Sequence, residues 1–195
     1  MRIFVALDID DAIRERITGF EDGVRNFAPD ARWVKPESLH VTLKFIGEQP
    51  DDSVEKIKQR LSSIEASASE IHFRNYGFFP TPKSARVFWI GMEAGPQLST
   101  LAGSVDESVY SLGIPKETRA FSPHLTLARG AGGSVAPHGN KSDRPNRVFQ
   151  RLQEKLSALP SPEFGTMTAG EFFLYQSRLS PKGSTYIKLA RFALK

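Results

Sequence analysis

Two short segments of the chain repeat one arrangement of side chains that can transfer protons. Both read His-x-Thr-Leu and lie in apolar, extended stretches at residues 40–43 and 124–127. Residues i and i+2 of a strand point to the same face. We therefore expect His40 to share a face with Thr42, and His124 with Thr126, while the apolar neighbours point into cores.

This set of groups suits the cleavage of a phosphodiester. Imidazole has an unperturbed pKa near 6.5, so one histidine can be neutral while the other is protonated at neutral pH. Such a pair can act as general base and general acid. Threonine hydroxyls can donate hydrogen bonds to phosphate oxygens. Nothing in this set requires a metal. A strand histidine beside a threonine can also be a half-buried filler, and the residues alone leave that alternative open.

The apolar pattern predicts the elements that must position these groups. Strands are expected at residues 3–9, 39–46, 71–79, 86–92, 122–129, 168–176 and 184–194. Four helices are expected: one that ends at Pro29, one that opens with an Asp52–Glu55 capping box, one that starts at Pro96, and one that carries Phe149 and Leu152. Residues 130–147 are rich in Gly, Pro, Ser, Asn and Arg, which predicts a flexible insertion.

Composition narrows the class of protein. The 195 residues suit one domain or two small lobes, and they contain no cysteine for disulfides or thiolate metal sites. No apolar run approaches the roughly 18 residues that cross a membrane. The net charge of +4 is compatible with a phosphorylated substrate or RNA. We expect an α+β fold of two lobes around a shared interface, and a cytoplasmic monomer.

The two tetrads and their flanks resemble the paired motifs of the two-histidine (2H) phosphoesterase superfamily. Within it, the chain is most similar to the RNA 2′,3′-cyclic phosphodiesterases, formerly called 2′-5′ RNA ligases. The first expected strand (residues 2–8) and the last two (residues 172–177 and 186–192) also resemble that family, so the likeness covers nearly the whole chain. It implies a single domain over residues 1–195, with two pseudo-symmetric lobes around a central cleft, each with an antiparallel sheet and helices.

The same resemblance implies an activity and roles for the residues. The activity is metal-independent hydrolysis of a terminal RNA 2′,3′-cyclic phosphate to a 2′-phosphate, with weak reverse 2′-5′ ligation and no cofactor. On the family pattern His40 is the proton donor, His124 is the proton acceptor, and Thr42 and Thr126 bind the phosphate. The substrate would be an RNA end or a small nucleotide. Another small cyclic phosphate, a 2′-5′ oligonucleotide, or RNA binding without catalysis are the alternatives.

Three residues beside the tetrads have open assignments. Strict alternation points Arg129 away from His124, so a phosphate-binding role requires a β-bulge or the end of the strand, and a surface ion pair is the alternative. Lys44 is in phase with His40 and is expected at the mouth of the cleft or at a solvated strand end. Phe45 is out of phase and is expected in the core, with base stacking as the alternative. Rim or core positions are expected for Trp33, Tyr76, Phe79 and Trp89; His72 is expected to be structural and His138 solvated.

Overall fold

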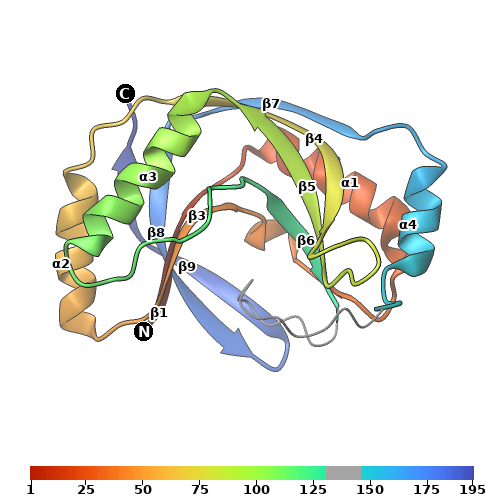
Figure 1. Cartoon of the computed structure of the whole chain (residues 1–195), viewed down its shortest axis with the longest axis horizontal. Coiled ribbons are helices and arrows are strands. Elements are labelled where there is room, and N and C mark those ends of the chain that lie inside the picture. Colours follow the sequence, from red (N-terminus) through yellow and green to blue (C-terminus); the bar gives the residue numbers. More distant parts are fainter. Residues whose placement is uncertain (131–145) are drawn as a thin grey trace.

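The computed structural model describes residues 1–130 and 146–195 (Figure 1). Within those ranges, the helices are α1 (Asp11–Val24), α2 (Asp51–Ser62), α3 (Pro96–Tyr110) and α4 (Gln150–Ser157), with short 3-10 helices at Arg25–Phe27 and Pro36–Ser38. The strands are β1 (Arg2–Leu7), β2 (Arg32–Trp33), β3 (Val41–Glu48), β4 (Ser69–Phe79), β5 (Val87–Ala94), β6 (Leu125–Arg129), β7 (Glu163–Ala169), β8 (Glu171–Ser180) and β9 (Gly183–Ala193).

The strands form two antiparallel sheets. The first has the order β3-β1-β8-β9 and the second the order β2-β6-β5-β4-β7. Helices α2 and α3 lie with the four-stranded sheet, whereas α1 and α4 lie with the five-stranded one (Figure 1). This arrangement confirms the expected α+β class with an antiparallel sheet and helices in each lobe. The sheets do not follow the two halves of the chain, because β8 and β9 return to pair with β1.

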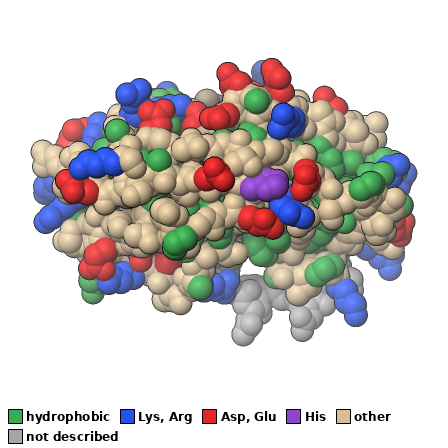
Figure 2. Space-filling view, turned by 90° about the horizontal axis from the view of Figure 1, so that it is seen from above, with side chains coloured by type: hydrophobic (Ala, Val, Ile, Leu, Met, Phe, Trp, Pro, Cys, Tyr) green, Lys and Arg blue, Asp and Glu red, His purple; other side chains and the backbone are tan. Residues whose placement is uncertain are grey.

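The amphipathic helices pack their apolar faces onto a continuous core. In α1, the side chains of Ile13, Ile17 and Val24 are buried, at the three-to-four spacing that predicted this helix. Burying each such side chain stabilises the fold by about 1.5–3 kcal/mol. Glu21 lies among them and is fully buried. The surface seen in Figure 2 carries both acidic and basic side chains near a histidine.

Several predicted boundaries are wrong. The capping box is absent, because α2 begins at Asp51 and its N-cap, Pro50, has no side chain that can accept a hydrogen bond. The expected strand at residues 168–176 spans two strands, β7 and β8, which Gly170 separates. The two-residue strand β2 was not predicted. The start of α3 at Pro96 is confirmed. Most of the predicted insertion at 130–147, and His138 within it, lies outside the described residues.

Candidate active site

Each histidine of the repeated motif lies one residue before its strand, not inside it as predicted. The residue after His40 opens β3, and the residue after His124 opens β6. The Nδ1 atom of His40 lies 2.7 Å from the carbonyl oxygen of Ser38, and Nδ1 of His124 lies 2.8 Å from that of Ser122. A carbonyl oxygen only accepts, so Nδ1 carries the hydrogen in both rings. The geometry leaves Nε2 of each ring to accept or donate a proton.

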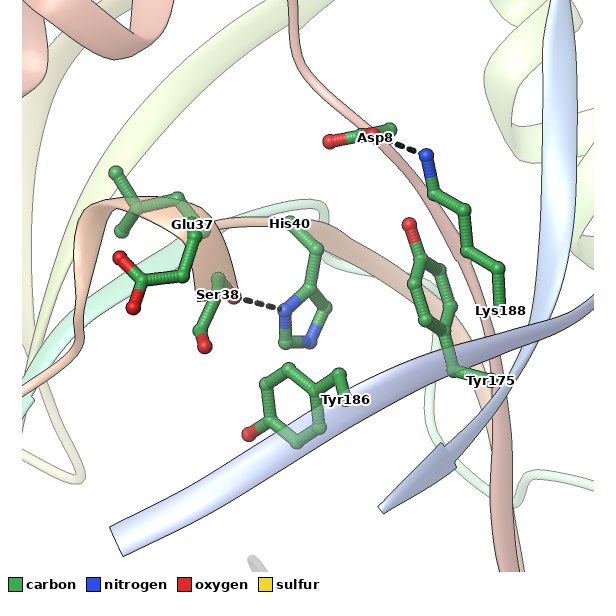
Figure 3. Close-up of a pocket in the computed structure, with 8 residues that line it drawn as sticks. Asp8, Glu37, Ser38, His40, Tyr175, Tyr186 and Lys188 are labelled. Atoms are coloured by element: carbon green, nitrogen blue, oxygen red, sulfur yellow. Dashed lines mark hydrogen bonds and ion pairs between the residues drawn. The ribbon is translucent and has the colours of Figure 1, made fainter. Parts of the chain in front are cut away.

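The His40 ring lies among aromatic side chains of the four-stranded sheet. The ring of Phe4 lies 5.0 Å away, and Tyr186 presents itself edge-on, also at 5.0 Å. Both belong to a small apolar cluster that also contains Tyr175. Figure 3 shows how Ser38 and Tyr186 flank the imidazole. These contacts fix the plane of the ring, and sequence reasoning assigned none of these aromatic residues to the site because their spacing carries no motif.

A cavity of about 320 Å³ opens beside His40. On its far side Asp8 accepts a hydrogen bond from Lys188 at 2.6 Å (Figure 3). It accepts a second one from Arg14 at 2.7 Å. Although burial opposes the effect, the hydrogen bond from Lys188 lowers the pKa of Asp8. An anionic carboxylate is therefore kept near the imidazole. The cavity is lined by Asp8, Glu37, Ser38, Leu39, His40, Tyr175, Tyr186 and Lys188.

The His124 ring has its own aromatic support from the five-stranded sheet. Phe79 contacts it edge-on at 5.1 Å, and Trp89 lies 6.3 Å away. Trp89 is also the strand partner of Thr126, so the two side chains point to one face. Its indole covers Gly77, where a Cβ would stand 2.1 Å from the ring, so only glycine fits there. Phe79 and Trp89 were expected in rim or core positions, and both border the His124 ring.

A β-bulge follows the threonine of the first motif. In the pairing of β1 with β3, Ala6 lies opposite Thr42 and Val5 opposite Lys44, so Leu43 is the extra residue. The bulge reverses the alternation. Lys44 is therefore buried, with 3% of its surface exposed, and its Nζ lies 2.7 Å from both Asp106 and the Pro115 carbonyl. Both predicted places for Lys44, the cleft mouth and a solvated strand end, are wrong.

The same bulge moves Phe45 from the predicted core to the surface. Its ring is 44% exposed and lies 6.0 Å from the ring of Phe4, which also contacts His40. Phe45 lies directly opposite Phe4 in the sheet, so both point to the face that carries Thr42. The predicted core position is wrong, and the ring stands beside the first motif.

An equivalent bulge follows the threonine of the second motif. In the pairing of β5 with β6, Trp89 lies opposite Thr126 and Phe88 opposite Ala128, so Leu127 is the extra residue. Leu127 and Ala128 are both buried, whereas Thr126 and Arg129 are partly exposed. Arg129 therefore shares the face of Thr126. The β-bulge that a phosphate-binding role required is present. No carboxylate of the described residues pairs with it, so the alternative of a surface ion pair finds no support there.

The two motifs act on each other electrostatically. Strands β3 and β6 contact each other although they belong to different sheets. The pKa of His40 is lowered to about 4, chiefly by burial, and the charges of Arg129 and His124 act in the same direction. Burial, and then Arg129, also lowers the pKa of His124. One guanidinium thus reaches both imidazoles, as a shared anion site requires.

The remaining groups of the site are uncharged. Within the described part of the chain, the hydroxyls of Thr42 and Thr126 have no hydrogen-bond partner, so they can donate to a ligand. Among the same residues no group of three or more His, Asp or Glu side chains could hold a metal ion.

His72 lies away from the site on β4, 3.9 Å from Glu163, which agrees with a structural role. No helix among the described residues is long and apolar enough to span a membrane.

Comparison with known proteins identifies the family. The family described as LigT like Phosphoesterase matches this sequence twice, over residues 7–89 and 90–186. The first match contains His40 and the second contains His124, so each repeat contributes one motif. The chain belongs to the LigT-like phosphoesterases.

Relatives of this LigT-like phosphoesterase align over almost its full length. It is 36% identical to the RNA 2′,3′-cyclic phosphodiesterase of Archaeoglobus fulgidus, over 98% of this chain and 99% of that protein. It is 31% identical to the RNA 2′,3′-cyclic phosphodiesterase of Methanothermobacter thermautotrophicus, over 100% and 99%. The crystal structure of E. coli LigT complexed with 3′-AMP superposes with a TM-score of 0.76 at 27% identity, over 99% of this chain and 97% of that one.

Proposed function

We propose that this LigT-like phosphoesterase hydrolyses the terminal 2′,3′-cyclic phosphate of RNA to a 2′-phosphate, without a metal ion. The observation that carries the proposal is the matched pair of imidazoles, each with Nδ1 bound to a backbone carbonyl and Nε2 available. The two relatives described above, which bear the name RNA 2′,3′-cyclic phosphodiesterase, support the choice of substrate. The function includes weak 2′-5′ ligation as the reverse reaction.

His124 acts as the general base and His40 as the general acid. Nε2 of His124 takes a proton from water, whose oxygen attacks phosphorus. The bond from phosphorus to O3′ breaks, and Nε2 of His40 delivers a proton to that oxygen. Asp8 favours protonation of His40, whereas no carboxylate is among the groups that shift the pKa of His124. Burial lowers the pKa of both rings, so the division of roles rests on the family resemblance, and the negative phosphate offsets the burial that otherwise keeps His40 neutral.

Thr42, Thr126 and Arg129 bind the phosphate. The two hydroxyls donate to its non-bridging oxygens, and the guanidinium neutralises the charge that grows in the transition state. Arg129 is suited to this role because the bulge in β6 places it on the face of Thr126 and its charge reaches both histidines. We further propose that residues 1–195 form one domain that acts as a cytoplasmic monomer, which sedimentation and cell fractionation would test.

Hydrolysis of an oligoribonucleotide with a 2′,3′-cyclic phosphate end, followed by product identification, tests the function. His40→Gln and His124→Gln should each lower kcat by at least about a hundredfold, with the fold intact, because each removes one proton transfer. His72→Gln is the matched control and should keep full activity. Activity should persist in chelator. Full activity of either site variant, or a 3′-phosphate product, would refute the assigned roles, and salt-dependent RNA binding without turnover would favour a binding module.

A further inference from the structure

Three arginines gather at one edge of the proposed site. Arg32 on β2 lies directly opposite Arg129 on β6, so both side chains point to the face that carries Thr126. Arg2 is the first residue of β1. It shares a face of the strand with Phe4, two residues further on, whose ring contacts His40. The edge is thus built from both sheets, with Arg2 from one, and Arg32 and Arg129 from the other.

This cluster is not neutralised by the protein. Like charges directly opposite each other destabilise a sheet. Burial lowers the pKa of Arg129, and the charges of Arg32 and Arg2 lower it as well, so the three groups lie within electrostatic reach of each other. No carboxylate of the described residues forms an ion pair with any of the three. Arg14, by contrast, is paired with Asp8, and the face in Figure 2 mixes both signs.

A single cyclic phosphate does not account for three arginines. Arg129 suffices for the phosphate that reacts, since its charge reaches both histidines. Arg2 and Arg32 remain, and both are accessible at the edge. An RNA strand supplies one further phosphate per nucleotide, and the guanidinium fork suits phosphate oxygens. Backbone contacts of this kind position a nucleic acid without reading its sequence.

We infer that Arg2 and Arg32 bind backbone phosphates of the RNA next to the reacting end, so that the enzyme favours polynucleotides over mononucleotides. This inference rests on the proposed function and names its substrate class. It assigns no part of the proton transfer to either arginine. The RNA would then leave the site on the side where Arg2 and Arg32 lie.

The test compares KM for two substrates of different length. One is an oligoribonucleotide of about ten residues with a 2′,3′-cyclic phosphate end, and the other is a nucleoside 2′,3′-cyclic monophosphate. Arg2→Gln and Arg32→Gln should each raise the ratio of the oligonucleotide KM to the mononucleotide KM by about fivefold. Each should also reduce the slope of log KM against log salt by about 0.7 for the oligonucleotide. Arg60→Gln, on the exposed face of helix α2, makes the same charge change away from the edge and should leave the ratio as it is.

Two results would overturn the inference. An unchanged oligonucleotide KM would mean that the arginines do not contact RNA, and an equal rise for both substrates would place them at the reacting phosphate. Fluorescence anisotropy of a labelled oligonucleotide, in the His124→Gln background, measures the same contacts without turnover. If Arg2→Gln and Arg32→Gln lower the affinity for the oligonucleotide in that assay, the inference is upheld even if no hydrolysis is found. Absence of hydrolysis by the unaltered protein would contradict the proposed function alone.

Discussion

The ligand-free protein should hold His40 in its neutral form at physiological pH. Burial lowers the pKa of this imidazole to about 4 from an ordinary value of 6.5. One pKa unit corresponds to 1.36 kcal/mol, so the difference between 6.5 and about 4 amounts to about 3 kcal/mol of preference for the neutral ring. At pH 7 only about one molecule in a thousand carries the imidazolium that the acid role requires. The bound substrate must therefore raise the pKa of His40.

NMR titration of the histidine ring protons measures this directly. The chain has four histidines, and the spectrum of His40→Gln identifies the signal. In the free protein that signal should titrate near pH 4. A nucleoside 2′-phosphate should raise the pKa of His40, because the bound anion stabilises the imidazolium. Arg129→Gln should raise the pKa of both His40 and His124, since the guanidinium lowers both.

The same shift makes stability depend on pH with a definite sign. A histidine whose pKa is lower in the folded state binds fewer protons there than in the unfolded chain, so stability falls as pH drops from 6.5 to 4. Urea unfolding should show the unaltered protein losing about 3 kcal/mol more than His40→Gln across that window. A signal that titrates near pH 6.5 in the free protein, or a pH-independent stability difference between the two proteins, would refute the reasoning.

Two further substitutions test buried charges outside the proton-transfer step. Lys44→Met should lower stability by about 3 kcal/mol in urea unfolding, because it leaves the Asp106 carboxylate unpaired, and Asp106→Asn in the same chain should restore part of the loss. Glu21→Gln should stabilise the protein by up to about 3 kcal/mol at pH 8 but little at pH 4, since burial raises the pKa of this carboxyl to about 7 and stability is lost as pH rises from 4.5 to 7. An equal effect of Glu21→Gln at both pH values would contradict this.

The reactive groups could be predicted from the sequence because their signal is local. In any extended backbone, His40 and Thr42 point to the same face because they are two residues apart. The same spacing at His124 and Thr126 strengthens the prediction of a shared site. The aromatic rings around His40 could not be predicted in this way. Phe4 and Tyr186 lie at opposite ends of the chain and meet only because β8 and β9 return to the first sheet. Such contacts depend on strand order, which periodicity does not encode.

The errors at Lys44 and Phe45 have the same cause that puts Arg129 on the face of Thr126. Side-chain alternation is a rule for regular strands, and an extra residue after each threonine breaks it. An isolated sequence shows no mark of either bulge, because Leu43 and Leu127 are ordinary strand residues. Burial shows the effect: two consecutive residues are buried after each threonine, and the third is exposed to the site.

The paired bulges also explain how a repeated motif produces an asymmetric site. Each motif presents a histidine just before the strand, then a threonine and the residue three positions after that threonine, to the same face. In β3 that residue is Phe45, which is apolar and exposed, and in β6 it is Arg129, which is charged and reaches both imidazoles. The backbone therefore places two equivalent sets of groups, and the side chain at this one position makes one end of the site cationic and the other apolar. On the proposed function, we expect the orientation of the bound substrate to follow from that difference rather than from the histidines themselves.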